Sequence, residues 1–391
     1  MIFILIFVFS FLLLFWYYFG YLLFLKFLLL VTRNKRKKAP PLFKKDSPPF
    51  VTILIPTYNE EKHILEKIKN TLEIDYPTDK KEIVIIDSAS QDGTVKNAEA
   101  LIQGEKNVKL LQETSRRGKG AALNYAISET QGEIILVTDA NSFLNCETLK
   151  RIIPHFCSED VGGVCGKFQV LETGKSLDFE NRTYWAFEEK LRSLESELDS
   201  VIHMSGEISA FRKGLALYDE NDLAEDFELA VQIRKKGFLL VYEPKAVANE
   251  EIPYKPEEFV KRKKDVTIGT IQTLWKHRDA IFNPKYGWYG MLILPSHKLL
   301  QIFLPWLSVL TVVSFQLGLI LNLSSQILKY FLAGESLIFV IVLLILGLPF
   351  GKRFSLTKRV RFYLLAQWII IGAWKDFFRG RFEVTWQKAG R

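Results

Sequence analysis

The chain has 391 residues, a formal net charge of +8 and 25% charged residues. This length allows one large domain with added elements, or two domains. The positive charge gathers beside strongly apolar segments, which is typical of loops next to a membrane and argues against a nucleic-acid-binding protein. The three cysteines, Cys146, Cys157 and Cys165, lack metal-ligand spacing, so we expect buried free thiols in a reducing compartment.

Residues 1–32 predict an N-terminal transmembrane helix. Between residues 2 and 31 Lys26 is the one charged residue, and about 20 apolar residues suffice to cross a bilayer. A signal peptide would need a charged start, a shorter apolar core and a small-residue cleavage site, so we favour an anchor. A dense basic run follows at 33–45. The positive-inside rule then predicts an integral membrane protein with an external N-terminus and a cytoplasmic central domain.

Residues 46–280 predict an α/β domain with a mostly parallel sheet and helices on both faces. Short β-branched runs predict strands at 50–55, 82–87, 107–111 and 133–138. Helical spacing occurs at 60–72, 93–102, 118–130 and 227–236. Strands that alternate with helices imply right-handed crossovers and a parallel sheet. In such sheets, ligands bind beyond the carboxyl ends of the strands.

Residues 281–391 predict interfacial and transmembrane helices with about two or three spans. Apolar stretches at 299–323 and 336–350 predict two spans. The second stretch is short, so its span would begin near residue 328 and tolerate charged residues near the interface. A basic loop at 352–361 then returns the chain to the cytoplasm. The stretch 362–378 has basic residues on both sides, which favours an interfacial or re-entrant helix over a crossing.

Polar residues cluster where the predicted strands end. The clusters are Pro56-Thr-Tyr-Asn-Glu60, Asp87–Thr94, Arg116–Asn124 and Asp139-Ala-Asn141. Acidic groups there can bind a base, a ribose or a divalent ion, and a glycine-opened helix start with basic residues can hold a pyrophosphate. Each cluster alone is compatible with an ordinary helix cap. Four in order, each at a strand end, predict a site for a nucleotide diphosphate.

Over residues 50–275 the chain resembles the family 2 glycosyltransferases with a GT-A fold, in the polysaccharide synthase and ceramide glucosyltransferase branch. The motifs that carry the resemblance are IPTYNEE, IDSASQDGT, RRGKGAALN, VTDAN, SGEISAFRK and AEDFELAVQIRKKGF. It implies a GT-A domain and an inverting, metal-dependent enzyme that uses a nucleotide-diphosphate sugar with Mg²⁺ or Mn²⁺. The acceptor would be a lipid, a lipid-linked sugar or a polysaccharide at the membrane.

The resemblance also implies roles for individual residues. Asp226, beside Glu225, would be the base that deprotonates the acceptor hydroxyl, and both also cap the following helix. Asp139 and Asn141 would hold the metal, while Gly206, Glu207 and His203 would line the acceptor side. The implied donor-binding residues are Pro56, Thr57, Tyr58, Glu60, Asp87, Ser88, Arg117, Lys119, Asp139, Ala140 and Arg262. Lys119 and the ion would neutralise the charge of the leaving diphosphate.

Two departures from the family pattern leave alternatives open. Asn141 offers a neutral amide oxygen where a carboxylate is usual, which weakens the metal site. The place of the Gln-x-x-Arg-Trp motif reads Arg262-Lys-Lys-Asp-Val266, without the tryptophan, and its basic residues either contact a phosphate or form a solvated helix face. We therefore favour a single addition to a lipid or lipid-linked acceptor over a processive synthase that exports a β-linked polysaccharide. An inactive membrane scaffold is the non-enzyme alternative.

Overall fold

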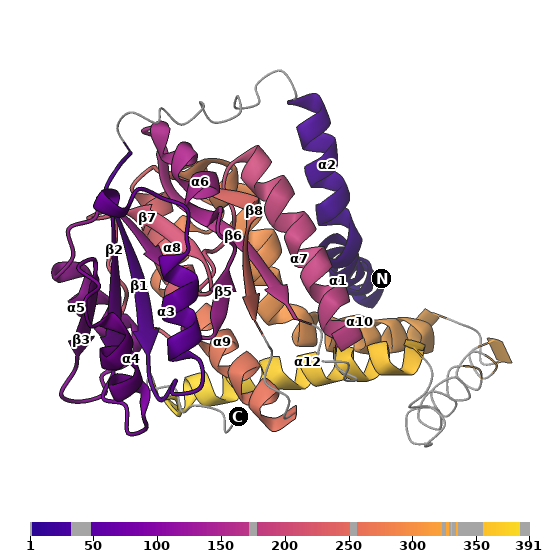
Figure 1. Cartoon of the computed structure of the whole chain (residues 1–391). Coiled ribbons are helices and arrows are strands. Elements are labelled where there is room, and N and C mark those ends of the chain that lie inside the picture. The colour runs from indigo at the N-terminus through magenta and orange to yellow at the C-terminus, as the bar shows by residue number, and fades with distance from the viewer. Residues whose placement is uncertain are drawn as a thin grey trace.

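The computed structural model describes residues 2–32, 48–171, 178–250, 256–322 and 355–383, together with isolated residues between 326 and 334 (Figure 1). The basic run at 33–45 and the predicted span at 336–350 lie outside these residues. The described chain forms an α/β domain with long apolar helices beside it.

One mixed sheet of eight strands, in the order β3-β2-β1-β4-β7-β6-β8-β5, forms the centre of the domain. The four predicted strands are confirmed and pair in parallel as the alternating pattern indicated. They are β1 (Val51–Thr57), β2 (Lys81–Asp87), β3 (Val108–Gln112) and β4 (Ile134–Val137). Their carboxyl ends therefore meet at one edge, where the polar clusters lie.

The other half of the sheet was not predicted from the sequence. β4 pairs antiparallel with β7, β7 antiparallel with β6, β6 parallel with β8, and β8 antiparallel with β5. These strands are β5 (Ser142–Leu144), β6 (Val161–Val170), β7 (Ser209–Arg212) and β8 (Leu239–Glu250). Glycines interrupt the apolar pattern of β6, and at Gly166 a Cβ atom would lie 2.6 Å from the carbonyl oxygen of Ala246. The backbone of β8 lies too close to Gly166 for a side chain there. β6 therefore contains glycines where a typical strand has β-branched residues, and its sequence did not predict a strand.

Helices cover both faces of the sheet, as predicted (Figure 1). Ile53 and Ile55 of β1 face the core beneath α3, whereas Leu54 faces the core beneath α5 and α8. α3 begins at Ile64 rather than at residue 60, because the preceding loop is tied to a neighbour: the Asn59 amide donates to Ser90 Oγ at 2.8 Å. The helices are α3 (Ile64–Leu72), α4 (Thr94–Ile102), α5 (Lys119–Ser128), α6 (Thr148–Ile152) and α8 (Glu225–Lys235).

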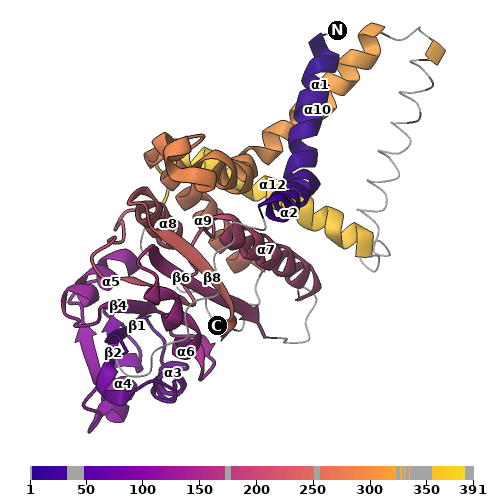
Figure 2. The ribbon, with the colours of Figure 1, turned by 90° about the horizontal axis from the view of Figure 1, so that it is seen from above.

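Two helical segments of the described chain are long and apolar enough to cross a membrane, Ile2–Val31 and Tyr289–Leu321, a criterion of length and composition alone. The first comprises α1 (Ile2–Phe15), η1 (Trp16–Gly20) and α2 (Tyr21–Val31), and the second joins η7 (Tyr289–Leu299) to α10 (Leu300–Asn322). The second begins before the predicted residue 299 because η7 continues into α10. α1 and α10 lie side by side in Figure 2. Between these two helices, the Thr311 hydroxyl donates to Ser10 Oγ at 2.9 Å.

Two further long helices join these apolar segments to the domain. α7 (Asp178–Leu198) packs against α2, and α9 (Pro256–Lys276) packs against α12 (Ser355–Phe378), where Lys264 lies 2.6 Å from Asp376. α12 includes the ambiguous stretch 362–378, and in Figure 2 it runs across the direction of α1 and α10. Its placement relative to a bilayer stays a prediction.

The prediction of buried thiols is wrong for two of the three cysteines. All three are free, but Cys146 and Cys157 are exposed and Cys165 alone is buried. Cys146 precedes the short helix α6 and Cys157 ends the turn that follows it, so both lie in a surface connection, whereas Cys165 is in the sheet.

Candidate active site

The ends of β1 and β2 bring two predicted donor-binding residues together. Thr57 Oγ1 lies 3.3 Å from Asp87 Oδ1, and the backbone amide of Ser90 donates to Asp87 Oδ2 at 2.9 Å. Asp87 is buried and fixed by these bonds. Pro56, at the end of β1, and Glu60, in the loop that follows, belong to the same edge.

The loops around this edge carry aromatic and basic groups. The guanidinium of Arg116 lies 3.8 Å from the centre of the Tyr58 ring, a cation–π contact. Ser88 Oγ donates to Glu113 at 3.0 Å, and Arg117 donates to the same carboxylate from Nε at 2.9 Å and from the NH2 nitrogen at 2.7 Å. Glu113, which directly follows β3, thus ties two predicted donor-binding residues together, and no sequence motif indicated it.

Lys119 joins the end of β4 to the start of α8. Its Nζ lies 2.7 Å from Asp139 Oδ1 and 3.3 Å from Glu225 Oε1. Burial acts to lower the pKa of Lys119, but the charges of Asp139 and Glu225 raise it well above its usual value. Gly206 approaches from the loop before β7, and a Cβ atom there would lie 3.1 Å from Lys119 Nζ. Three regions predicted from separate motifs therefore form one site.

Three carboxylates, from Asp139, Glu207 and Glu250, form a candidate metal site. One carboxylate oxygen from each of the three residues lies within 4.8 Å of those from the other two. Arg262 borders the group, with its guanidinium nitrogens 3.5 Å from Glu207 and 3.6 Å from Glu250. Burial first, and then the charges of Glu207 and Asp139, raise the pKa of Glu250. Crowded carboxylate oxygens of this kind fit a divalent cation such as Mg²⁺ or Mn²⁺.

This candidate site differs from the predicted pair Asp139 and Asn141. Glu207 had been placed on the acceptor side, and Glu250 had been missed. Glu250 is the last residue of β8, a strand not predicted from the sequence, although an acidic residue at a strand end was the signal used elsewhere. Asn141 lies half-buried just before β5, next to the buried Ala140, and its role as a ligand stays a prediction.

Asp226 is in the first turn of α8, as predicted, and is partly buried. The backbone amide of Phe227 donates to its Oδ1 at 2.8 Å. Burial first, and then the charges of Glu225 and Glu207, raise the pKa of Asp226 to about 7. Burial and the neighbouring carboxylates therefore outweigh the preference of a helix N-terminus for the ionised form. A carboxyl group with this pKa is suited to general-base catalysis near neutral pH.

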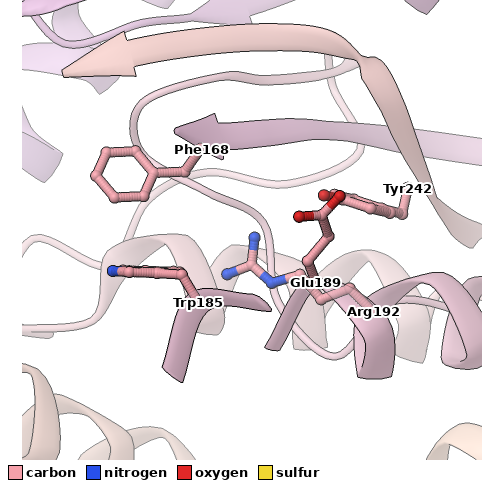
Figure 3. Close-up of a pocket in the computed structure, with 5 residues that line it drawn as sticks. All are labelled: Phe168, Trp185, Glu189, Arg192 and Tyr242. Carbon is pink, nitrogen blue, oxygen red and sulfur yellow. The ribbon is translucent and has the colours of Figure 1, made fainter. Parts of the chain in front are cut away.

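His203, a predicted acceptor-side residue, lies beside Arg192, which no sequence motif indicated. Its Nε2 contacts the guanidinium of Arg192, which comes from α7. Burial first, and then the charge of Arg192, lower the pKa of His203 well below its usual value, so the ring is neutral. Arg192 also borders a small pocket, and Figure 3 shows its guanidinium between Trp185 and Tyr242. The other lining residues are Phe168 and Glu189.

Lys67, on α3, supports the loop that carries Asp139. Its side chain is fully buried; Nζ donates to Thr138 Oγ1 at 2.7 Å and also bonds the Ser142 carbonyl oxygen. Lys67→Met would leave both oxygens without this donor, so we expect the unfolding free energy to fall by about 2 kcal/mol. We also expect Mn²⁺ binding to weaken about tenfold (about 1.4 kcal/mol) because the loop is less well held. Calorimetric titration with Mn²⁺ and thermal unfolding measure the two effects.

Lys69→Met is the matched control, since Lys69 is on the same helix but exposed. It should change neither quantity. If Lys67→Met lowers stability while Mn²⁺ binding is unchanged, Lys67 supports the core and not the metal loop.

The sequence similarity to known proteins concerns the α/β domain. Residues 52–217 match the model of the family described as glycosyl transferase family 2. These residues form a family 2 glycosyltransferase domain. Asp226, Glu250 and Arg262 lie beyond the matched range, so their assignment rests on the geometry above.

Curated glycosyltransferases are also similar in sequence to parts of this chain. A probable glycosyltransferase, YdaM, of Bacillus subtilis (strain 168) is 27% identical over 215 residues, which are 52% of this chain and 51% of that protein. A beta-monoglucosyldiacylglycerol synthase of Nostoc sp. (strain PCC 7120) is 38% identical over 118 residues, 30% of this chain and 25% of that protein. The chain thus spans about half, or less, of the length of these curated relatives.

The fold of the glycosyltransferase domain and its helices has a solved counterpart. The mannosyltransferase PcManGT from Pyrobaculum calidifontis, in complex with GDP-Man and Mn²⁺, superposes with a TM-score of 0.69 at 23% identity. The match covers 96% of this chain and 99% of that chain. At this identity the likeness shows the fold, and it confirms the predicted GT-A architecture.

Proposed function

We propose that the chain is a membrane-anchored, inverting glycosyltransferase. It transfers a sugar from a nucleotide-diphosphate donor to a lipid or lipid-linked acceptor at the cytoplasmic face, with its N-terminus external. The observation that carries this proposal is the position of Lys119 between Asp139 and Glu225. This lysine joins a candidate metal site to the residue that precedes Asp226, so the groups for the leaving diphosphate and for the acceptor proton share one site.

Donor binding would use the residues at the strand ends. Asp139, Glu207 and Glu250 would hold a divalent ion, which when bound neutralises charge on the diphosphate. Lys119 would bind a phosphate oxygen, and Arg262 lies beside the same carboxylates. Thr57 and Asp87 would hold the nucleoside. A relative named as a glycolipid synthase and a fold neighbour with bound GDP-Man and Mn²⁺ support a nucleotide sugar and a metal.

Asp226 would act as the base. As the acceptor hydroxyl oxygen attacks the anomeric carbon, its proton passes to the carboxylate of Asp226. The bond between the anomeric carbon and the phosphate oxygen breaks, and its electron pair leaves with the nucleotide diphosphate. A single in-line displacement of this kind inverts the configuration of the sugar. The hydrogen bond from Phe227 leaves Asp226 Oδ2 available for the incoming proton.

A lipid acceptor is favoured by how the apolar helices meet the domain. α2 packs on α7, which carries Arg192 beside the predicted acceptor residue His203. η7 packs with α8 and α9 in one cluster that includes Phe227, the neighbour of Asp226. The segments that are apolar enough to enter a bilayer thus contact the helices that carry the candidate base and the acceptor side.

Incubation of the protein in lipid vesicles with labelled nucleotide sugars and Mg²⁺ or Mn²⁺ tests the proposal. A product that extracts into organic solvent with one added sugar is expected. A long lipid-free polymer would instead establish the processive synthase. Release of nucleotide diphosphate that is equally negligible in the parent chain and in Asp226→Asn, with every donor and metal, would support the inactive scaffold.

The raised pKa of Asp226 predicts a particular pH dependence. Only the ionised carboxylate accepts a proton, so kcat/KM for the donor should rise about tenfold per pH unit below 7 and level off above it. An ordinary carboxylate would place this limb near pH 4. Steady-state rates between pH 5.5 and 8.5, with donor binding measured at the same pH values, separate the base from any titration of the binding site. A flat profile over this range would contradict the assignment.

A further inference from the structure

Basic groups from several elements converge on the acceptor side of Asp226. Arg192 comes from α7, His203 from the loop before β7, Lys263 from α9 and Lys298 from η7. The Arg192 guanidinium bonds His203, and Lys298 Nζ lies 5.6 Å from the centre of the ring of Phe227, the residue after Asp226.

These groups share one electrostatic neighbourhood. Burial lowers the pKa of His203, and the charges of Arg192, Lys298 and Lys263 lower it further. Burial, with the charges of Arg262 and Lys298, likewise lowers the pKa of Lys263, to about 8. Lys263 Nζ also lies 5.4 Å from the centre of the ring of Trp185, and Trp185 lines the pocket in Figure 3 together with Arg192. Lys298 thus acts on both His203 and Lys263. Burial acts to lower the pKa of Arg192, but nearby negative groups, Glu188 and Glu207 among them, raise it.

Three of the neighbouring carboxylates have ion-pair partners elsewhere. On α7, Glu195 lies 2.8 Å from His297 Nδ1 and accepts from the Tyr21 hydroxyl at 2.7 Å, while Glu188 lies 3.2 Å from His297 Nε2. Glu207 faces Arg262. In the part of the chain that the structure describes, no carboxylate lies within ion-pair distance of Arg192 or Lys298.

A bound anion would lower the electrostatic cost of this arrangement. Like charges in a partly buried region repel more strongly than in water, and burial adds a desolvation cost for each. A lysine within a segment apolar enough to enter a membrane is especially costly unless it has a function. A phosphate group, with several charged oxygens, would accept hydrogen bonds from both guanidinium and ammonium groups.

We propose that Arg192, Lys263 and Lys298 form a subsite for a phosphate group on the acceptor, which is therefore a phosphate-bearing lipid. This inference rests on the proposed function. The phosphate belongs to the acceptor because Lys298, on η7, which leads into α10, lies beside the ring of Phe227, the residue after the candidate base. Lys119 and Arg262 instead border the carboxylates of the donor side.

Binding without donor tests the subsite. The full chain in phosphatidylcholine nanodiscs is titrated with dihexanoyl phosphatidic acid, with dihexanoylglycerol, which lacks the phosphate, and with inorganic phosphate. We expect the phosphatidic acid to bind at least tenfold more tightly than either of the others. Lys298→Gln should weaken its binding at least tenfold, and Lys298→Arg should retain it. Lys106→Gln removes an exposed lysine in the loop before β3 and should have no effect.

The outcomes separate the possible sources of the anion. Equal binding of dihexanoylglycerol and phosphatidic acid overturns the proposal. Inorganic phosphate that binds as tightly as the lipid points to a free anion and overturns the assignment to the acceptor. Affinity for a nucleotide diphosphate that falls in parallel in Lys298→Gln moves this lysine to the donor side. Phosphatidic acid binding that depends on Lys298, in a chain that transfers no sugar from any donor, refutes the proposed function alone.

Discussion

Replacing Asp226 with asparagine is expected to lower kcat for sugar transfer about 10³-fold, because the amide cannot accept the acceptor proton. Donor binding should change little, since asparagine has the same shape and its Oδ1 can still accept from Phe227. Nucleotide diphosphate release and calorimetric donor binding measure the two quantities. Asp79→Asn lies in the exposed turn that precedes the amino end of β2, opposite the carboxyl ends where the site lies; it is the matched control and should behave as the parent chain. Transfer within tenfold of the parent rate would exclude Asp226 as the base.

The same substitution should stabilise the protein at neutral and higher pH. Asp226 has its pKa raised from 3.8 to about 7 in the folded state, so between these pH values the folded chain binds more protons than the unfolded chain. Stability from this group is therefore lost as the pH rises through that window. The amide that replaces the carboxyl group does not titrate, so the melting temperature of Asp226→Asn should exceed that of the parent at pH 8 and approach it at pH 4. A loss of activity with a gain of stability is the signature of a functional buried carboxyl.

Replacing Asp139 with alanine is expected to abolish the effect of the metal on donor binding. Asp139 is shared between the carboxylate group and Lys119, so its loss removes a ligand oxygen and the partner of the lysine. We expect donor affinity in the presence of Mn²⁺ to fall at least 100-fold, about 2.7 kcal/mol, and the remaining affinity to be the same with and without the ion. Calorimetric titration with the nucleotide sugar measures both states.

Further variants identify the other ligands. Asp160→Ala removes an exposed carboxylate and should leave both affinities unchanged. Glu250→Gln should weaken Mn²⁺ binding, measured by electron paramagnetic resonance, more than Asn141→Ala if the three carboxylates hold the ion. The reverse order would restore the pair Asp139 and Asn141. Donor affinity in Asp139→Ala that still responds to Mn²⁺ as in the parent chain would refute a metal site at Asp139.

Local sequence patterns predicted many residues of the candidate site. β1, β2 and β4 are continuous apolar runs, and a polar residue must follow each where the chain leaves the sheet. Because parallel strands end at one edge, the order of the motifs alone placed Asp87, Lys119 and Asp139 together. The pKa shifts of the site residues could not be predicted from local sequence in this way. The pKa of Asp226 depends on the burial of Asp226 and on the charge of Glu207. Glu207 precedes β7 in the sequence and comes near α8 only through the fold.

The sequence by itself determined the apolar segments, the parallel half of the sheet and the residues at its strand ends, because these depend on local periodicity and on the geometry of parallel strands. The tertiary structure decided the rest. Glu250 and Arg262 reach the carboxylate group from β8 and α9, and Arg192 reaches His203 from α7. Such contacts arise from antiparallel pairing and helix packing between distant segments, which no local pattern specifies. For the same reason, Lys67 resembled any other helix residue until the structure placed it beneath the loop of Asp139.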